Sequence, residues 1–319
     1  MAKSLHGFRA ALGAGWMALG ACGALYAQLR GIPASVAAPA LGALLVEYPF
    51  YLATGFGDLR ERVTRGWLPV FLITGAVLPY LACCFGAAPF QWTSLARIVL
   101  TIGAIASWYV ALPVCAATDL GFGVLLGWAL LSGFLARIYP TPYPHVEISI
   151  LAKLAVFQSA ALALMAARGM TQTGYGFVPT WREIRIGALH FVYFAPIGLP
   201  LALGLRAVHF AKPAPLWVVA GTFVAFLWVV ALAEEFLFRG VLQALLEERL
   251  GNQQAALLAT SVLFGLVHLW FRGFPNWRWA LVAGTLGWFC GRARNQAGGI
   301  RASVVTHALT VAAWRAFFA

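Results

Sequence analysis

Residues 216–239 have the sequence LWVVAGTFVAFLWVVALAEEFLFR. No charge occurs from Leu216 to Ala233, and a membrane-spanning helix needs about 20 mostly apolar residues. Glu234, Glu235 and Arg239 follow this apolar run directly. A charge at the centre of a membrane helix costs about 2.5–3.5 kcal/mol on insertion scales, so these side chains require partners or a wet cavity. The stretch therefore predicts a membrane helix that carries a polar site.

The same apolar pattern repeats along the rest of the chain. Of its 319 residues, 62% are hydrophobic and only 10% are charged, whereas a soluble domain has about 25% charged residues. Short clusters with Arg, Pro or Gly separate the apolar stretches. We therefore predict an all-α, polytopic transmembrane helix bundle with ten or eleven spans. The expected helices are residues 8–29, 33–55, 67–88, 97–117, 119–137, 149–168, 186–208, 215–249, 253–271, 276–294 and 300–318.

The net charge of +12 comes from basic residues scattered among the connections. They form no basic domain with interleaved aromatic residues, so a nucleic-acid partner is not expected. Arginines in alternate connections fit the positive-inside rule for a chain with a cytoplasmic N-terminus. The five cysteines have no C-x-x-C spacing and are expected to be packing residues.

The longest polar connection, residues 168–185, predicts a division into two parts. Residues 1–168 form N-terminal transmembrane helices of unassigned role, and residues 169–319 hold the polar motifs. The end of this connection, Trp181–Arg185, is expected either as an amphipathic turn on the membrane surface or as a solvated loop.

Five ionisable side chains stand out in the apolar C-terminal segments. Glu235 and Arg239 are four residues apart on one helix face and form the expected ion pair. Glu234 lies about 100° further around the helix and has no local partner. A lone intramembrane histidine is more often structural, but the next helix carries His268 and the last carries His307. Glu and His around one cavity could activate water, and a second His could stabilise an oxyanion.

These residues resemble the signatures of a known family. Glu234-Glu235-x-x-x-Arg239 is similar to the EExxxR signature, and Phe264-x-x-x-His268 to the FxxxH signature, of the CPBP family of glutamate-dependent intramembrane proteases, which process CAAX proteins and bacteriocins. The resemblance covers roughly residues 216–318 and includes the Gly-rich segment Ala283–Trp288, the Gly298-Gly299 turn and the helix with His307.

The resemblance implies a role for each matched residue. Glu234 and His268 would hold and activate the attacking water, Glu235 and Arg239 would brace the site, and His307 would help to form the oxyanion pocket. The chain would then be an intramembrane endopeptidase without a metal cofactor, in a bacterial inner membrane. Its partners would be the lipid bilayer and a membrane-associated or C-terminally tailed polypeptide.

One departure from the family pattern concerns the last helix. The family usually has HxxxN there, but this chain has His307-Ala-Leu-Thr310-Val311. Valine has no donor, whereas the Thr310 hydroxyl could supply one. A non-catalytic membrane binding or immunity protein on the same scaffold therefore stays open. A small-solute transporter is a second alternative, although the sequence has no inverted repeat of the kind typical of transporters.

Zinc is an open alternative for the site itself. Glu234, His268 and His307 are acceptable zinc ligands by residue type, and their spacing does not decide the matter. The family resemblance favours general-base chemistry without a metal.

Two acidic features in the N-terminal part allow other hypotheses. Gly55-Phe-Gly-Asp58 matches the GxGD string of intramembrane aspartyl proteases, but Asp119 is the only other aspartate in the chain. Glu47 lies in an apolar segment beside Pro49. It is expected either on a substrate or ion path or in a pair with an arginine.

Overall fold

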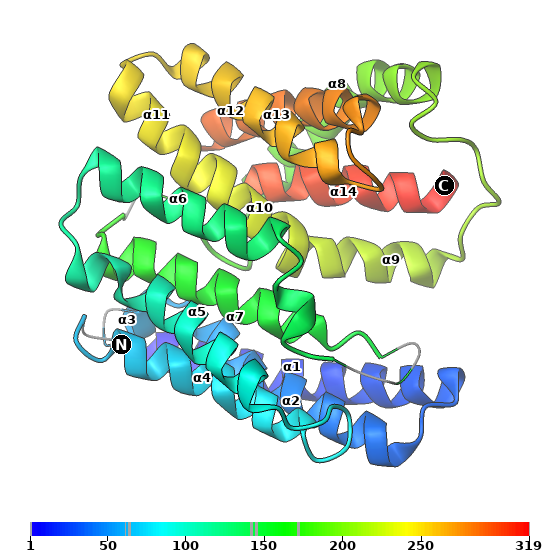
Figure 1. Ribbon diagram of the computed structural model, residues 1–319. Coiled ribbons are helices and arrows are strands. Elements are labelled where there is room, and N and C mark those ends of the chain that lie inside the picture. The colour runs from blue at the N-terminus through cyan, green and yellow to red at the C-terminus, as the bar shows by residue number, and fades with distance from the viewer. Residues whose placement is uncertain are drawn as a thin grey trace. The chain divides into compact units, whose positions relative to one another are not determined.

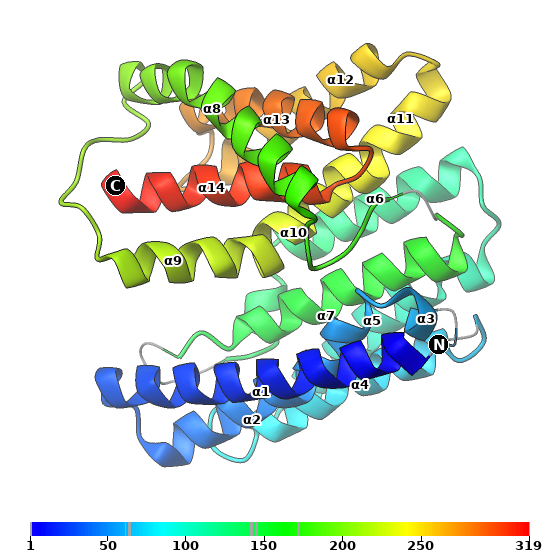
Figure 2. The same cartoon turned by 180° about the vertical axis from the view of Figure 1, so that it is seen from behind.

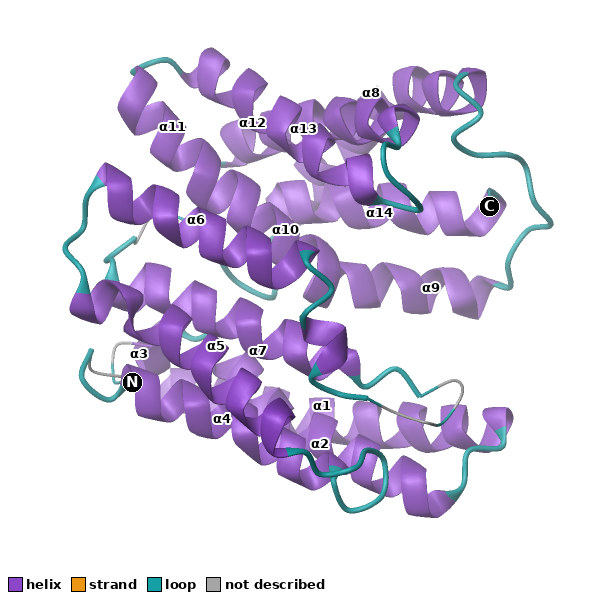
Figure 3. Cartoon of the chain, viewed as in Figure 1, coloured by secondary structure: helices purple, strands orange, loops and turns teal. Residues whose placement is uncertain are grey.

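Each apolar segment of the sequence forms helix, since a helix satisfies its own backbone polar groups in lipid. The computed structural model describes residues 2–60, 62, 65–140, 143, 146–170 and 173–318. In this part of the chain, regular structure consists of helices joined by loops, apart from one isolated bridge (Figure 3). Residues 61, 63–64 and 171–172, in two polar connections, lie outside the described residues. The chain divides into two compact units, Met1–Met170 and Thr171–Ala319.

The helices have the length and hydropathy of membrane spans. Among the described residues, seven helices are long and apolar enough to cross a membrane. Leu68–Cys83 and Ala116–Leu130 are shorter apolar helices. The last two of the eleven predicted segments correspond to the helices Trp277–Ala297 and Arg301–Phe317. The prediction of an all-α membrane bundle is confirmed, and the chain is an integral membrane protein.

The first unit packs its helices around one buried helix, α7. The α7 helix contacts α2, α4, α5 and α6, and nearly all of its side chains are buried. A helix that is apolar on all sides belongs in the interior of a bundle. In Figure 1 this unit runs from blue to green. Its helices are α1 (Ala2–Arg30), α2 (Ala34–Ala53), α3 (Gly57–Arg60), α4 (Leu68–Cys83), α5 (Trp92–Ala111), α6 (Ala116–Leu131), η1 (Leu135–Arg137), α7 (Ser149–Leu162) and η2 (Ala163–Ala167).

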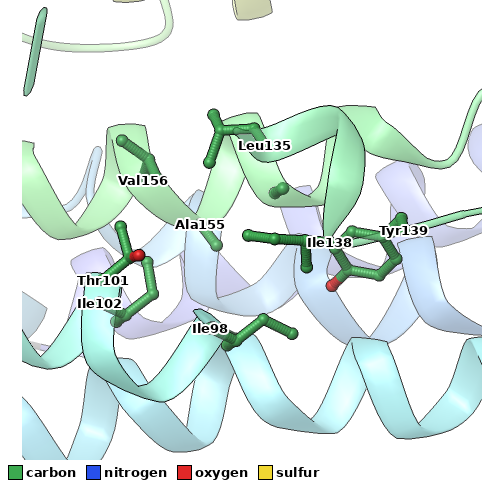
Figure 4. A pocket seen from close by; sticks show the side chains of 10 residues that line it. Ile98, Thr101, Ile102, Leu135, Ile138, Tyr139, Ala155 and Val156 are labelled. Atoms are coloured by element: carbon green, nitrogen blue, oxygen red, sulfur yellow. The ribbon is translucent and has the colours of Figure 1, made fainter. Parts of the chain in front are cut away.

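The core of this unit leaves little free space. A cavity of about 10 Å³ lies between α4, α5, η1 and α7, which is about the space that one water molecule needs. Figure 4 shows the aliphatic side chains around it, with the polar Thr101 and Tyr139 also in its wall. The first unit is therefore closely packed at this point and offers no room there for a substrate.

Glu47 lies on α2 and is fully buried. Gln158 on α7 is also fully buried, and within the described chain neither the Glu47 carboxylate nor the Gln158 carboxamide has a hydrogen-bond partner. In the described ranges no arginine forms an ion pair with Glu47, so the expected arginine partner is not found there. The ion-path alternative remains a hypothesis.

Asp119 at the start of α6 forms an ion pair with Arg168. Nε and Nη2 of Arg168 donate to the two carboxylate oxygens over 2.7 and 2.8 Å, and the Tyr109 hydroxyl donates over 2.9 Å. Arg168 directly follows η2, so its ion pair with Asp119 attaches this end of η2 to α6, and the Tyr109 hydrogen bond attaches α5 to the same carboxylate. Because this carboxylate serves an ion pair, the aspartyl-protease alternative loses its second acid, while Asp58 is exposed on α3.

Asp119→Asn is expected to lower the free energy of unfolding by about 1.5–3 kcal/mol, the usual range for hydrogen bonds to charged groups. The amide keeps the shape but removes the charge that Arg168 requires. Chemical denaturation in detergent measures the loss, and Asp58→Asn, at an exposed position, is the control. Equal midpoints for the two variants would contradict the structural role of the pair.

The second unit is a separate helical bundle. Helix α13 packs against both α12 and α8, and α14 packs against α8, α9 and α13. Figure 2 shows α8 crossing beside α13 and α14. Its helices are α8 (Trp181–Gly204), α9 (Leu216–Ala225), η3 (Phe226–Val230), α10 (Ala231–Glu235), η4 (Phe236–Leu242), α11 (Gln243–Leu250), α12 (Gln253–Val267), η5 (His268–Trp270), α13 (Trp277–Ala297) and α14 (Arg301–Phe317).

Helix α8 begins at Trp181, so the prediction of a solvated loop for residues 181–185 was wrong, while their placement on the membrane surface stays a prediction. Thr180 and Glu183 form a capping box, in which each side chain accepts from the other's backbone N–H. Such reciprocal bonds satisfy the free donors of a first helical turn. Glu183 also pairs with Arg301 at the start of α14 over 2.8 Å. The charged residues therefore start the helix and dock it.

Residues 216–250 form one continuous helical segment that includes two π-helical turns. These turns, η3 and η4, lie directly before and after α10, which carries Glu234 and Glu235. π-helical turns are frequent at functional sites because they re-aim side chains within a helix. The helix is therefore distorted both before and after the short segment that carries Glu234 and Glu235.

Candidate active site

Three helical segments of the second unit bring the predicted residues to one cavity. Glu234 comes from α10, His268 from the α12–η5 junction and His307 from α14. All three line a cavity of about 610 Å³, within the usual range of about 300–1,000 Å³ for ligand sites. The remaining walls are mainly apolar and aromatic. The expected convergence of the glutamate and both imidazoles on one cavity is therefore present.

Glu235 forms the buried support of this site. Its Oε1 accepts from Nη1 of Arg239 at 3.1 Å and from Nδ1 of His307 at 2.9 Å. Glu235 and Arg239 are both fully buried, so the predicted ion pair is formed. The sequence had left His307 without a partner, because the two residues are 72 positions apart. The Glu235 carboxylate thus holds both the Arg239 guanidinium and the His307 imidazole in place.

Arg239 also stacks on an aromatic ring. Its Cζ lies 4.2 Å from the ring centroid of Phe264, and that ring lies 4.7 Å from the ring of His268 and 5.8 Å from that of His307. A guanidinium over an aromatic face gains cation–π attraction, which strengthens away from water. The phenylalanine of the FxxxH signature thus packs between the arginine and both histidines.

Gly287 on α13 leaves the space that the Arg239 guanidinium occupies. A Cβ at this position would lie 2.9 Å from Nη2 of Arg239 and 3.3 Å from the Phe264 ring. Gly284, one helical turn earlier, faces α12, and its Cβ would meet Ser261 and Gly265 only at ordinary van der Waals distances of 3.4 and 3.7 Å. The two glycines are therefore a matched pair for testing the site.

Gly287→Ala is expected to destabilise the protein by about 1–3 kcal/mol through overpacking, whereas Gly284→Ala should change stability by less than about 1 kcal/mol. The methyl group displaces a buried guanidinium in the first case and enters tolerable space in the second. Thermal unfolding of both variants in the same detergent makes the comparison. A larger loss for Gly284→Ala would be inconsistent with the packing described.

Glu234 differs from Glu235 in its surroundings. Its side chain is 34% exposed, against 0% for Glu235. Its Oε2 lies 4.0 Å from Nε2 of His307, too far for a direct hydrogen bond. A polar contact of this length can accommodate a bridging water. Glu234 is therefore the carboxylate that is open to the cavity.

The hydrogen bonds of the two histidines show which ring nitrogen is already engaged and which one is left to interact with a ligand in the cavity. Nδ1 of His268 lies 2.7 Å from the Phe264 carbonyl oxygen, and Nδ1 of His307 lies 2.9 Å from the Glu235 carboxylate. Both partners are acceptors, so both Nδ1 atoms donate. In a neutral imidazole this leaves Nε2 as an acceptor, and in an imidazolium Nε2 becomes a second donor.

Thr310 and Val311 also line the cavity. The Thr310 hydroxyl donates to the Thr306 carbonyl over 2.9 Å, a common bond for threonine within a helix. In this rotamer its proton is directed to the backbone and not into the cavity. Thr310 therefore offers no free hydroxyl proton to the cavity. On α14, the side chain close to Glu234 is His307, whose Nε2 lies 4.0 Å from Oε2 of Glu234.

The structure adds features that sequence reasoning missed. These are the Glu235–His307 hydrogen bond, the ring of Phe264 beneath Arg239 and the small residue at Gly287. Each joins residues from different helices, so no local spacing could have indicated them. Among the described residues, no group of three or more His, Cys, Asp and Glu side chains has a metal-binding arrangement.

Fold and site together define an integral membrane protein with a buried polar centre in its second helical unit. Residues 215–313 match the family described as type II CAAX prenyl endopeptidase Rce1-like. The match to this segment confirms the resemblance drawn from the two signatures. At the family level these proteins are intramembrane CAAX-type endopeptidases and therefore hydrolases. Comparisons with curated proteins and with solved structures gave no match.

Proposed function

We propose that this chain is a glutamate-dependent intramembrane endopeptidase whose second unit hydrolyses a peptide bond. The observation that carries the proposal is the shared cavity of Glu234, His268 and His307, together with the 4.0 Å gap between Oε2 of Glu234 and Nε2 of His307. A carboxylate and two imidazoles at a sheltered cavity are the groups that acyl hydrolysis needs.

Glu234 and His268 activate the attacking water in this proposal. A water in contact with the Glu234 carboxylate gives up a proton as its oxygen bonds to the substrate carbonyl carbon. Nε2 of His268, the acceptor nitrogen of that ring, orients the water through a hydrogen bond. The carbonyl π electrons move to oxygen and produce a tetrahedral oxyanion. The protonated Glu234 then returns its proton to the leaving amine as the C–N bond breaks.

His307 stabilises the oxyanion as an imidazolium. Its Nδ1–H donates to Glu235, so protonation of Nε2 provides a second donor, which is directed to the cavity. Arg239 and Glu235 act as positioning residues, because they hold this ring and do not touch the substrate. A donor fixed before reaction stabilises the developing charge without reorganisation.

The substrate proposed is a membrane-associated or C-terminally tailed polypeptide in a bacterial inner membrane. The apolar walls of the cavity accept apolar side chains or a lipid-modified residue next to the bond that is cut, while the polar residues occupy only part of its lining. The first unit lies outside the family match, and we assign it to recognition of the substrate helix. No metal takes part in the proposed steps.

The decisive experiment uses protein reconstituted in lipid nanodiscs, a mixed library of apolar peptides and water enriched in ¹⁸O. A peptidase incorporates one ¹⁸O atom into each newly formed carboxylate, which mass spectrometry detects. A non-catalytic binding protein would enrich peptides without cutting them, and a transporter would leave them unlabelled. Either result would overturn the proposed function, and a parallel incubation without protein controls for spontaneous hydrolysis.

A further inference from the structure

The core of the first unit holds a carboxyl group and a carboxamide on two adjacent helices. Glu47 on α2 and Gln158 on α7 are each 0% exposed. The two helices pack against each other, and the Tyr51 ring on α2 lies 6.0 Å from the Phe157 ring on α7. Tyr51 is one helical turn after Glu47, and Phe157 directly precedes Gln158. Both polar groups therefore lie where α2 and α7 meet inside the bundle.

The polar atoms of these two side chains have no partner. Within the described chain, no hydrogen bond reaches Oε1 or Oε2 of Glu47, or Oε1 or Nε2 of Gln158. The two side chains are nevertheless close enough to interact. Buried polar side chains in native proteins nearly always have a hydrogen-bond partner. Four such atoms on two neighbouring side chains therefore require an explanation.

The polar side chains around Glu47 supply no positive charge. Tyr139, which follows η1, interacts with Glu47 and also with Tyr80 and Cys83 of α4. On α1, the Trp16 indole bonds to the α2 backbone two residues before Glu47. Tyrosine and cysteine are uncharged at neutral pH, as is an indole, and none of the ion pairs in the described ranges includes Glu47. A carboxyl group buried without a counter-charge becomes neutral instead of staying ionised.

A proton satisfies all four atoms, whereas a bare carboxylate or a metal cation does not. An ionised carboxylate only accepts hydrogen bonds, so it could bond to Nε2 of Gln158 but would leave Oε1 of Gln158 without a donor. A cation would bind oxygen atoms and leave the Nε2–H donors unused. A protonated Glu47 donates its O–H to Oε1 of Gln158, and its carbonyl oxygen accepts from Nε2. The acid and the amide then share two reciprocal hydrogen bonds.

We propose that Glu47 and Gln158 form a proton-binding site in the core of the first unit. The Glu47 carboxyl group binds the proton, and its pairing with the Gln158 carboxamide ties α2 to the central helix α7 without a buried charge. The site lies outside the segment that matches the protease family. It is independent of the proposed peptidase activity and gives the first unit a chemical site of its own.

Infrared spectroscopy of the protein in lipid nanodiscs tests this site, because a protonated carboxyl group has a C=O band that a carboxylate lacks. The measurement is made at about pH 8, far above the ordinary glutamate pKa of about 4.3. We expect a protonated-carboxyl band that Glu47→Gln removes and that changes frequency in Gln158→Leu. Glu248→Gln, at an exposed acid, should retain the band. Identical spectra of wild-type protein and Glu47→Gln would overturn the proposal.

A swapped pair separates proton binding from a general need for these two side chains. Glu47→Gln combined with Gln158→Glu moves the acid from α2 to α7 and preserves both reciprocal bonds. This variant should show the band and unfold near the wild-type midpoint, even if Glu47→Gln alone does not fold. Gln158→Leu should lower the midpoint by roughly 2–10 °C, because the buried acid loses its partner. A swapped variant that folds without the band would contradict the site.

A cation is the remaining rival occupant, and thermal unfolding in sodium, potassium or choline chloride distinguishes it from a proton. We expect equal midpoints for wild-type protein in the three salts at one ionic strength, since a proton site needs no metal ion. A midpoint that rises with sodium or potassium in wild-type protein, but not in Glu47→Gln, would assign Glu47 to cation binding and overturn the inference.

Discussion

Glu234→Gln is expected to lower kcat for peptide hydrolysis by about 10²–10⁴-fold, the contribution of a general base, while the protein still folds. The amide keeps the size of the carboxyl group but cannot take a proton from water. Because the Glu234 side chain is open to the cavity, its loss should not disturb the buried Glu235–Arg239 pair. Peptide binding should persist within about tenfold, since binding needs apolar contacts and not the base.

Glu248→Gln is the matched control, because Glu248 is an exposed acid on α11 and does not line the cavity. It should leave kcat unchanged. Single-turnover measurements with saturating protein separate the chemical step from substrate binding. A Glu234→Gln protein that turns over within tenfold of wild type would falsify the role of this carboxylate as base. Loss of folded protein would instead indicate a structural role.

Arg239→Met is expected to cost about 3–5 kcal/mol of stability, the usual result of removing one partner from a buried ion pair. Both members of the pair are fully buried, so the Arg239→Met variant would leave the Glu235 carboxylate without its cationic partner while it still accepts from His307. The change also removes the cation–π contact with Phe264. We expect a lower unfolding midpoint and a lower yield of folded protein.

A second variant distinguishes the loss of charge balance from the loss of packing. Glu235→Gln combined with Arg239→Met removes both charges, and it should recover part of the stability because no lone charge remains. Arg294→Met is the control for a less buried pair, since the Arg294 and Glu247 side chains are 14% and 21% exposed, and its loss should cost less than that of the fully buried pair. Equal midpoints for Arg239→Met and Arg294→Met would contradict a special role for burial.

The helices of this protein could be predicted because lipid leaves the backbone few choices. Every apolar segment of about 20 residues formed a helix, including the long run from Leu216, since each backbone N–H and C=O must find its partner within the segment. Helix ends were less accurate. The helix expected at 97–117 spans Trp92–Ala111, and residues 112–115 continue as a non-helical connection that contains Pro113, because proline removes a backbone donor.

Local polar chemistry explains the error at the start of α8, which was expected at residue 186 and begins at Trp181. Trp181–Arg185 has charged residues at the position where either a surface turn or a loop was expected, yet Thr180 and Glu183 form a capping box there. Thr-x-x-Glu is a known helix start, so this feature was present in the sequence and was overlooked. The ion pair between Glu183 and Arg301 was not accessible in the same way, because it joins residues 118 positions apart.

By itself, the sequence determined the membrane class, the helices, the Glu235–Arg239 pair and the set of ionisable residues, because these depend on composition and on spacing within one helix. Only the tertiary structure decided which glutamate is buried and which faces the cavity, that His307 donates to Glu235, and that Arg239 stacks on the Phe264 ring. Those features depend on how separate helices pack. A side chain's exposure and its distant partners are set by neighbours that helical periodicity does not specify.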